Sequence, residues 1–320
     1  MAILLREKHV TELLDIEIVM DAVEEVLRDQ AEGQATNRPR YRVATPTSQL
    51  HLMAAGDNRL GVYGLKVYTA SRKGARFLVM LYESDTGDLL AMIEADRLGQ
   101  MRTGAASGVA TKYMARKDAR TVGIYGTGWQ AESQLMAVCT AREIETIKAY
   151  GRNAERRLAF AQRMTSVLGV EVKSVDTPEE AAAGCSIIIT ATTARAPVLK
   201  GEWIERGAHI NAMGSNSLAK SEIDIEAINR ATVIAVDSID QSRIEAGDLL
   251  PAMERGIVTW ESVIELGRIV AGQVPGRNSD DDITIFKSNG IALEDISTAL
   301  RLYNLALERG VGENIELWVE

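Results

Sequence analysis

Residues 121–134, TVGIYGTGWQAESQ, are the stretch that decides the fold of this chain. They place Gly126, Gly128 and Ala131 in a G-x-G-x-x-A spacing, directly after a predicted strand and before a predicted helix. Gly126 permits a tight turn, Gly128 lets the backbone approach a pyrophosphate, and Ala131 permits close packing of helix on strand. The free N–H groups at the start of the helix add positive potential. We therefore predict a dinucleotide-binding loop, and its predicted contacts also include Thr127, Trp129 and Gln130.

The segments around this loop alternate between short apolar strands and helices or compact loops. Six runs rich in Val, Ile and Thr show the pattern: TVGIYG, ETIKAYG, VEVKSVD, CSIIITATT, AHINAMGS and ATVIAVDS. Nearly continuous apolar strands in such an alternation indicate a parallel sheet that is covered on both faces. We therefore predict an α/β fold with a Rossmann-type, doubly wound parallel sheet over residues 119–290.

The N-terminal part of the chain has a different pattern. Apolar residues at helical spacing predict an amphipathic helix over residues 15–31. Residues 61–95 are β-rich and are interrupted by the turn signal DTGD, and residues 102–117 are helical and rich in small side chains. A last helix is predicted over residues 292–310. We expect a second, α+β domain over residues 1–118 that is completed by the C-terminal helix, residues 291–320.

Composition excludes several classes of function. The net charge of −9, without a basic stripe, disfavours a nucleic-acid surface, and no segment has the length and apolarity of a membrane span. The N-terminus lacks the pattern of a signal peptide, so we expect a cytoplasmic protein. The three histidines, His9, His51 and His209, have no partners at metal-ligand spacing, so no metal site is predicted. Of these, only His51 lies near sequence that we consider functional.

The residues that follow the second strand bear on the choice of cofactor. An NAD enzyme typically has Asp or Glu here, which accepts hydrogen bonds from the ribose 2′-hydroxyl. Residues 149–153 read AYGRN, so this chain has Arg152 and Asn153 instead, with Arg157 one turn later. A guanidinium group can bind a 2′-phosphate through two charge-assisted hydrogen bonds. The pattern favours NADP(H) over NAD(H), and a solvated surface position for Arg152 is the alternative.

Five stretches together resemble the ornithine cyclodeaminase/μ-crystallin family, and their order and spacing match over essentially the whole chain. They are KVYT (66–69), MRTGAASGVATKYMAR (101–116), YGTGWQA (125–131), GSNSLAKSEID (214–224) and FKSNGIALEDISTA (286–299). The resemblance implies a nicotinamide cofactor and a second domain that binds substrate and forms a homodimer through its β-sheet. It also implies that the substrates are amino acids or imines derived from them. Members include ornithine cyclodeaminase, alanine dehydrogenase and ketimine reductases.

The resemblance also assigns substrate-binding residues. Lys66 matches the family's active-site lysine, and Arg42 and Arg102 match its two carboxylate-binding arginines. A carboxylate-bearing substrate requires fixed cations, which agrees with these roles. Because RPRYR (38–42) contains three arginines, a solvent-facing Arg42 is the alternative. Phe77 and Leu78 stand where many relatives have a threonine, which makes the expected pocket more apolar.

Asp224 matches the family's acidic residue beyond the fifth strand, where it would accept or donate the proton on the substrate nitrogen. Its alternative role is the N-cap of the following helix, a position at which Asp is favoured. Glu222 is the second candidate for the acid–base group. The resemblance places further residues along the cofactor: Thr192, Thr193, Ser215, Asn216, Lys287 and Gly290.

These observations predict an NADP(H)-dependent oxidoreductase that reduces the C=N bonds of imines or ketimines derived from amino or keto acids. A small imine or amino acid is the expected substrate, and alanine dehydrogenase, ketimine reductase and imine reductase activities all fit the same residues. Two alternatives remain at this stage. One is an ornithine cyclodeaminase with catalytic NAD, and the other is a binding protein that, like μ-crystallin, retains an NADPH site.

Overall fold

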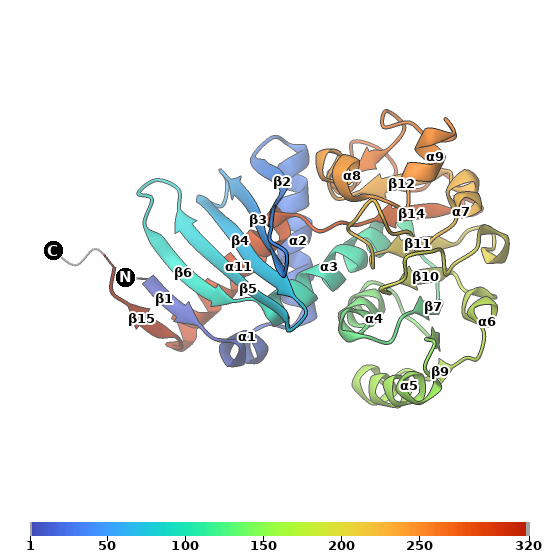
Figure 1. The fold of residues 1–320 in the computed structure, drawn as a ribbon, viewed down its shortest axis with the longest axis horizontal. Coiled ribbons are helices and arrows are strands. Elements are labelled where there is room, and N and C mark those ends of the chain that lie inside the picture. The colour runs from blue at the N-terminus through green and yellow to red at the C-terminus, as the bar shows by residue number, and fades with distance from the viewer. Residues whose placement is uncertain (1, 318–320) are drawn as a thin grey trace. The chain divides into compact units, whose positions relative to one another are not determined.

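The computed structural model describes residues 2–317, which divide into two compact units (Figure 1). Unit 1 comprises Met1–Arg102 and Ile291–Glu320, and unit 2 comprises Thr103–Gly290. Sequence analysis places the first boundary after residue 118, whereas the units divide within helix α3 (Asp96–Met114), because this helix continues from one unit into the other. Within the described residues, no helix has the length and apolarity needed to span a bilayer.

Unit 1 contains a seven-stranded sheet in the order β15-β1-β6-β5-β4-β3-β2. Its five long strands pair antiparallel with their chain neighbours, whereas β1 is parallel to β6. The strands are β1 (Ala2–Leu5), β2 (Ala35–Ala44), β3 (Ser48–Asp57), β4 (Val62–Ser71), β5 (Gly74–Glu83), β6 (Leu89–Glu94) and β15 (Glu313–Ile315).

Besides the first part of α3, the described residues of this unit form the helices α1 (Glu7–Leu13), α2 (Ile16–Ala31) and α11 (Ala292–Arg309). The predicted amphipathic helix is confirmed as α2, which is capped by Asp15, whose carboxylate accepts a hydrogen bond from the Ile18 N–H at 2.8 Å. Helix α11 packs across the sheet from β2 to β6 and against α2. It buries the sheet residues Met53, Val79, Leu81 and Ile93 on that face.

Unit 2 contains an eight-stranded sheet in the order β13-β12-β14-β11-β10-β7-β8-β9, and all its strand pairs are parallel. The predicted fold class, a Rossmann-type doubly wound sheet plus a second α+β domain, is confirmed. The strands are β7 (Thr121–Tyr125), β8 (Thr146–Tyr150), β9 (Val172–Ser174), β10 (Ile187–Thr190), β11 (His209–Ala212), β12 (Val233–Val236), β13 (Ile264–Glu265) and β14 (Thr284–Lys287). The helices are α4 (Trp129–Ala141), α5 (Ala154–Leu168), α6 (Pro178–Ala182), α7 (Ile225–Arg230), α8 (Ile239–Glu245), α9 (Leu250–Glu254) and α10 (Leu266–Val270), with a 3₁₀ turn η1 (Gly201–Trp203).

Both faces of this parallel sheet are buried. Successive residues of β10 pack into different cores: Ile188 joins one cluster, and Ile187 and Ile189 join the other. This explains why the strands are continuous apolar runs rather than alternating ones. The strand order reverses between β7 and β10, and such switch points at the carboxyl ends of the strands are where folds of this kind bind ligands.

Candidate active site

The glycine loop has the geometry that pyrophosphate binding requires. Gly126 has a φ of +110°, and a Cβ there would lie 2.3 Å from the Ala191 carbonyl oxygen, so only glycine fits the turn. Gly128 begins helix α4 without a side-chain cap, and a Cβ there would meet no heavy atom within 4 Å. The start of this 13-residue helix therefore combines N–H groups without a side-chain cap and open space at Gly128, which fits an anionic group of a dinucleotide. Ala131 is buried against the strand, and Trp129 is exposed.

Two cations lie shortly after β8: Arg152 in the loop, and Arg156 in the first turn of α5. Arg152 and Arg156 are exposed, and neither side chain has a hydrogen bond or ion pair within residues 2–317. Asn153 caps α5, where its Oδ1 accepts a hydrogen bond from the Arg156 N–H at 2.8 Å. Arg157 is a predicted cofactor contact, and that role stays a prediction. Its buried guanidinium donates to the Gly151 carbonyl at 3.0 Å, and to Ser174 and Asp176, so it fixes the shape of the loop.

The residues that follow β10 and β11 lie at the same edge of the sheet as the glycine loop. Thr192 lies next to Gly126: its methyl group is 3.4 Å from the position that a Cβ on Gly126 would occupy. Thr193 is exposed. Asn216 is also exposed. Ser215 is buried, and its hydroxyl donates to the carbonyls of Ser217 and Lys220, so it supports the loop from within.

Lys287 is the last residue of β14, and Gly290 lies three residues beyond it. Both form hydrogen bonds within the protein. Lys287 is fully buried, and its Nζ lies 2.5 Å from the Ser215 carbonyl oxygen, 3.3 Å from that of Ala212 and 3.0 Å from Asp248. The Gly290 N–H donates to Asp237 at 2.6 Å. Lys287 therefore ties loops together, and its predicted contact with the cofactor stays a prediction.

The two acid–base candidates beyond β11 also hold the local structure. Asp224 is the N-cap of α7, and its Oδ1 accepts hydrogen bonds from the N–H groups of Ala227 at 2.8 Å and Gly201 at 2.9 Å. This is the alternative role that the sequence left open. Glu222 is fully buried and accepts hydrogen bonds from Thr190, Thr192 and Gly214. Burial raises the pKa of Glu222, and the bond from Thr192 and the charge of Lys287 oppose that change.

Two predicted substrate-binding cations meet in unit 1. Lys66 on β4 lies with its Nζ 2.7 Å from Oδ1 of Asp295 on α11. Arg102 on α3 donates to the same oxygen at 3.0 Å and to Glu294 at 2.8 Å. The two carboxylates are fully buried and the two cations nearly so, with side-chain exposures of 3% for Lys66 and 8% for Arg102. Sequence reasoning gave no role to Glu294 or Asp295.

Lys66 keeps donor capacity in this arrangement. An ammonium group carries three protons, and Asp295 is the hydrogen-bond acceptor of Lys66 within residues 2–317, so two N–H bonds remain for a ligand. The pKa of Lys66 is lowered to about 8, chiefly by burial; Asp295 opposes this change, and the charges of Arg102 and Arg40 contribute to it. A group that titrates near neutral pH can both give and regain a proton.

An aromatic row lies next to Lys66 on adjacent strands. His51 stacks on Tyr68 with ring centroids 4.2 Å apart, and Tyr68 stacks on Phe77 at 4.8 Å. The Nζ of Lys66 is 5.3 Å from the centre of the Phe77 ring. Arg42, which is half-buried, pairs in register with His51. Burial lowers the pKa of His51 to about 4, and the charges of Arg42 and Arg40 contribute, so this imidazole is neutral at neutral pH.

The sequence matches the family model described as the ornithine cyclodeaminase/mu-crystallin family over residues 2–310. The chain belongs to this family. It is 40% identical to a Delta(1)-pyrroline-2-carboxylate reductase from Bacillus cereus over 273 residues, which cover 83% of this chain and 84% of that protein. The family prediction is therefore confirmed.

Solved structures of family members superpose over nearly the whole chain. Delta(1)-pyrroline-2-carboxylate reductase from Thermococcus litoralis, in complex with NADH and L-proline, has a TM-score of 0.93 and 36% identity, and the match covers 98% of this chain and 100% of that one. An archaeal alanine dehydrogenase dimer with bound NAD has a TM-score of 0.93 and 33% identity, with 99% of each chain covered. These relatives are reductases and dehydrogenases, which confirms the prediction of an oxidoreductase enzyme.

Proposed function

We propose that this protein is a nicotinamide-dependent oxidoreductase that reduces the C=N bond of imines or ketimines derived from amino or keto acids. The observation that carries the proposal is the buried ammonium group of Lys66, which has two uncommitted N–H bonds beside the guanidinium of Arg102. The names of the relatives support it, because one reduces a cyclic imine carboxylate and another is solved with NADH and L-proline.

The roles of the chain's own residues follow from charge and donor capacity. A bound nicotinamide cofactor would supply the hydride. Arg102 and Arg42 hold the substrate carboxylate, since a planar guanidinium can bind both of its oxygens. Lys66 orients the C=N group and donates a proton to its nitrogen. We assign this proton to Lys66 rather than to Asp224, because Oδ1 of Asp224 accepts two backbone hydrogen bonds at the N-terminus of α7.

We further propose that NADPH is the preferred cofactor. Arg152 and Arg156 are exposed, and neither side chain has a hydrogen bond or ion pair within residues 2–317. Arg152 lies in the loop after β8, where NAD enzymes typically have a carboxylate, and Arg156 lies in the first turn of α5. They flank the N-terminus of the 15-residue helix α5, whose N–H groups also favour an anion. The 2′-phosphate of NADPH fits this charge. The relatives solved with NADH or NAD make a direct comparison of the two cofactors necessary.

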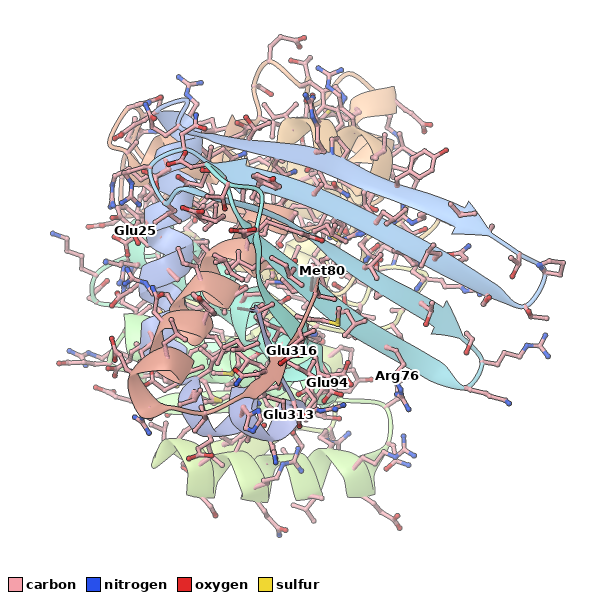
Figure 2. The ribbon with its side chains drawn as sticks, turned by 90° about the vertical axis from the view of Figure 1, so that its left-hand side faces the viewer. Glu25, Arg76, Met80, Glu94, Glu313 and Glu316 are labelled. Atoms are coloured by element: carbon pink, nitrogen blue, oxygen red, sulfur yellow. The ribbon has the colours of Figure 1, made fainter. Side chains whose placement is uncertain are left out.

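The protein is also proposed to form a homodimer through the sheet of unit 1. Tyr41 and Tyr63 on this sheet are 68% and 42% exposed, and Val43 is exposed as well. Figure 2 draws the side chains of these strands and labels Arg76 and Met80 on β5. Large apolar side chains gathered on one sheet are typical of a protein interface. The dimeric archaeal relative supports this proposal, and light scattering of Tyr63→Glu against the wild type tests it: the variant should be monomeric.

The test of the function is the oxidation of NADPH, followed by absorbance, when the purified protein meets a cyclic ketimine carboxylate. NADH is assayed in parallel. We expect rapid oxidation of NADPH and slower oxidation of NADH. Release of ammonia from ornithine with catalytic NAD, without reduction of any imine, would overturn the proposal in favour of a cyclodeaminase. Tight NADPH binding without turnover across imines and amino acids would overturn it in favour of a binding protein.

A further inference from the structure

The carboxylate of Asp295 accepts hydrogen bonds from two predicted substrate-binding cations within residues 2–317. Its Oδ1 accepts from Lys66 Nζ at 2.7 Å and from Arg102 Nε at 3.0 Å. Its Oδ2 is buried and has no hydrogen-bond partner within residues 2–317. The carboxylate is fully buried, so solvent does not screen its interaction with the two cations. A carboxylate that only filled a helix N-terminus would bond to backbone N–H groups instead.

The negative charge of Asp295 offsets the positive charges that lie close to Lys66. The groups that face its ammonium are Asp295 from α11, Arg102 from α3 and Arg40 from β2, with the Phe77 ring from β5. Arg40 and Arg102 are themselves buried. A buried ammonium group beside two guanidinium groups favours its neutral form, and among these groups Asp295 is the one that favours the charged form.

We propose that Asp295 is a positioning residue that holds the Lys66 side chain in place and keeps it protonated as the proton donor to the C=N nitrogen. The inference rests on the proposed function. During reduction, hydride adds to the imine carbon, the C=N π electrons form the new N–H bond with a proton from Lys66, and the substrate becomes an amine. Lys66 is left neutral and regains its proton from water, and Asp295 keeps its charge throughout.

The main experiment is the pH dependence of kcat/KM for Asp295→Asn and the wild type with a cyclic ketimine carboxylate. The protonated lysine is required, so the wild-type rate should fall as pH rises through about 8. Loss of the carboxylate removes the group that favours the ammonium. The high-pH limb of Asp295→Asn should therefore move to lower pH by about one unit or more, with a loss in kcat/KM of about fivefold or more at pH 8.

A second substrate distinguishes a loss of proton donation from a general structural effect of the substitution. An N-methylated cyclic iminium carboxylate already carries its charge and needs no proton, so Asp295→Asn should reduce it within about threefold of the wild-type rate. Glu294→Gln is the matched control, because Glu294 pairs with Arg102 whereas Asp295 contacts both cations. We expect Glu294→Gln to raise KM without moving the high-pH limb. The inference would be overturned if Asp295→Asn lost the same factor in kcat/KM on both substrates, or if its high-pH limb stayed where the wild-type limb is.

A readout without catalysis keeps the inference testable on its own. Acylation of Lys66 in the full chain, followed by mass spectrometry over pH, reports the fraction of neutral amine. The midpoint for Asp295→Asn should lie below that of the wild type, and Asp295→Ser serves if the first variant does not fold. If the wild type reduces no imine but the midpoint shifts, the proposed function fails while the pairing stands. If imines are reduced and the midpoint is unchanged, the inference about Asp295 fails.

Discussion

Gly126→Ala should destabilise the protein even when no cofactor is present. The residue has a φ of +110°, which costs an L-residue about 1–2 kcal/mol. The added methyl group would lie 2.3 Å from the Ala191 carbonyl oxygen and 2.8 Å from its carbon, and relief of such a backbone clash costs about 1–3 kcal/mol more. We therefore expect a loss of about 2–5 kcal/mol in the free energy of unfolding.

Gly128→Ala is the matched substitution in the same loop, and it should lower the affinity for the cofactor while leaving stability nearly unchanged. Gly128 has ordinary extended dihedral angles (φ −95°, ψ −174°), and its Cβ would meet no heavy atom within 4 Å. The free energy of unfolding should change by less than about 0.5 kcal/mol. The methyl group would, however, occupy the space in front of the α4 N–H groups. NADPH affinity should fall at least about tenfold, which corresponds to about 1.4 kcal/mol.

Thermal melting of the cofactor-free variants and fluorescence titration with NADPH measure the two effects separately. If Gly126→Ala melts like the wild type, the steric argument for this turn is wrong. If Gly128→Ala binds NADPH as tightly as the wild type, a pyrophosphate does not sit at the N-terminus of α4. Either result alone refutes its part of the reasoning.

Three further predictions concern single charged or titratable groups. Arg152→Ala should lower kcat/KM for NADPH about tenfold and leave that for NADH within about twofold, because only NADPH has a 2′-phosphate; equal losses in the two steady-state assays would contradict this. Lys287→Met leaves Asp248 buried without its cation, so the free energy of unfolding should fall by about 3–5 kcal/mol, and an unchanged melting temperature would count against this. Burial lowers the pKa of His209 to about 3 in the folded state, so the unfolded chain binds more protons between about pH 3 and 6.5 and stability falls as pH decreases through that window. His209→Gln should flatten this slope by up to about 1.4 kcal/mol per pH unit in denaturant unfolding curves, and parallel curves would show that His209 is not the cause.

The strands of unit 2 could be predicted because each is a short apolar run buried on both faces, a local property of the sequence. Strand β2 could not. Its sequence, ATNRPRYRVA, contains three arginines and Pro39, and most of its residues are exposed or half-buried. It lies at the edge of the sheet, where a proline removes no essential hydrogen bond. Its pairing with β3 is tertiary information that the composition of the segment does not contain.

The same limit applies to the site. The glycine loop is a local motif, so its geometry followed from residue type and spacing. Asp295 was missed because an acid in the first turn of α11 is also what the helix dipole favours. The available signal was its position: Asp295 lies on the apolar face of α11, three residues after Ala292 and seven before Leu302, both buried. A carboxylate in such a position requires a buried cation as its partner.

Two buried lysine–aspartate pairs in this chain differ in the hydrogen-bonding capacity that their lysines retain. Lys287–Asp248 and Lys66–Asp295 are almost equally buried, so burial does not distinguish them. Lys287 donates hydrogen bonds to two backbone carbonyl oxygens and forms an ion pair with Asp248, so its charge is held within the loops that it joins. Among residues 2–317, Lys66 donates to a single oxygen, and it retains two N–H bonds beside Arg102. Uncommitted donor capacity on a buried, charged group is costly for folding, and the role that we propose for Lys66 rests on this feature.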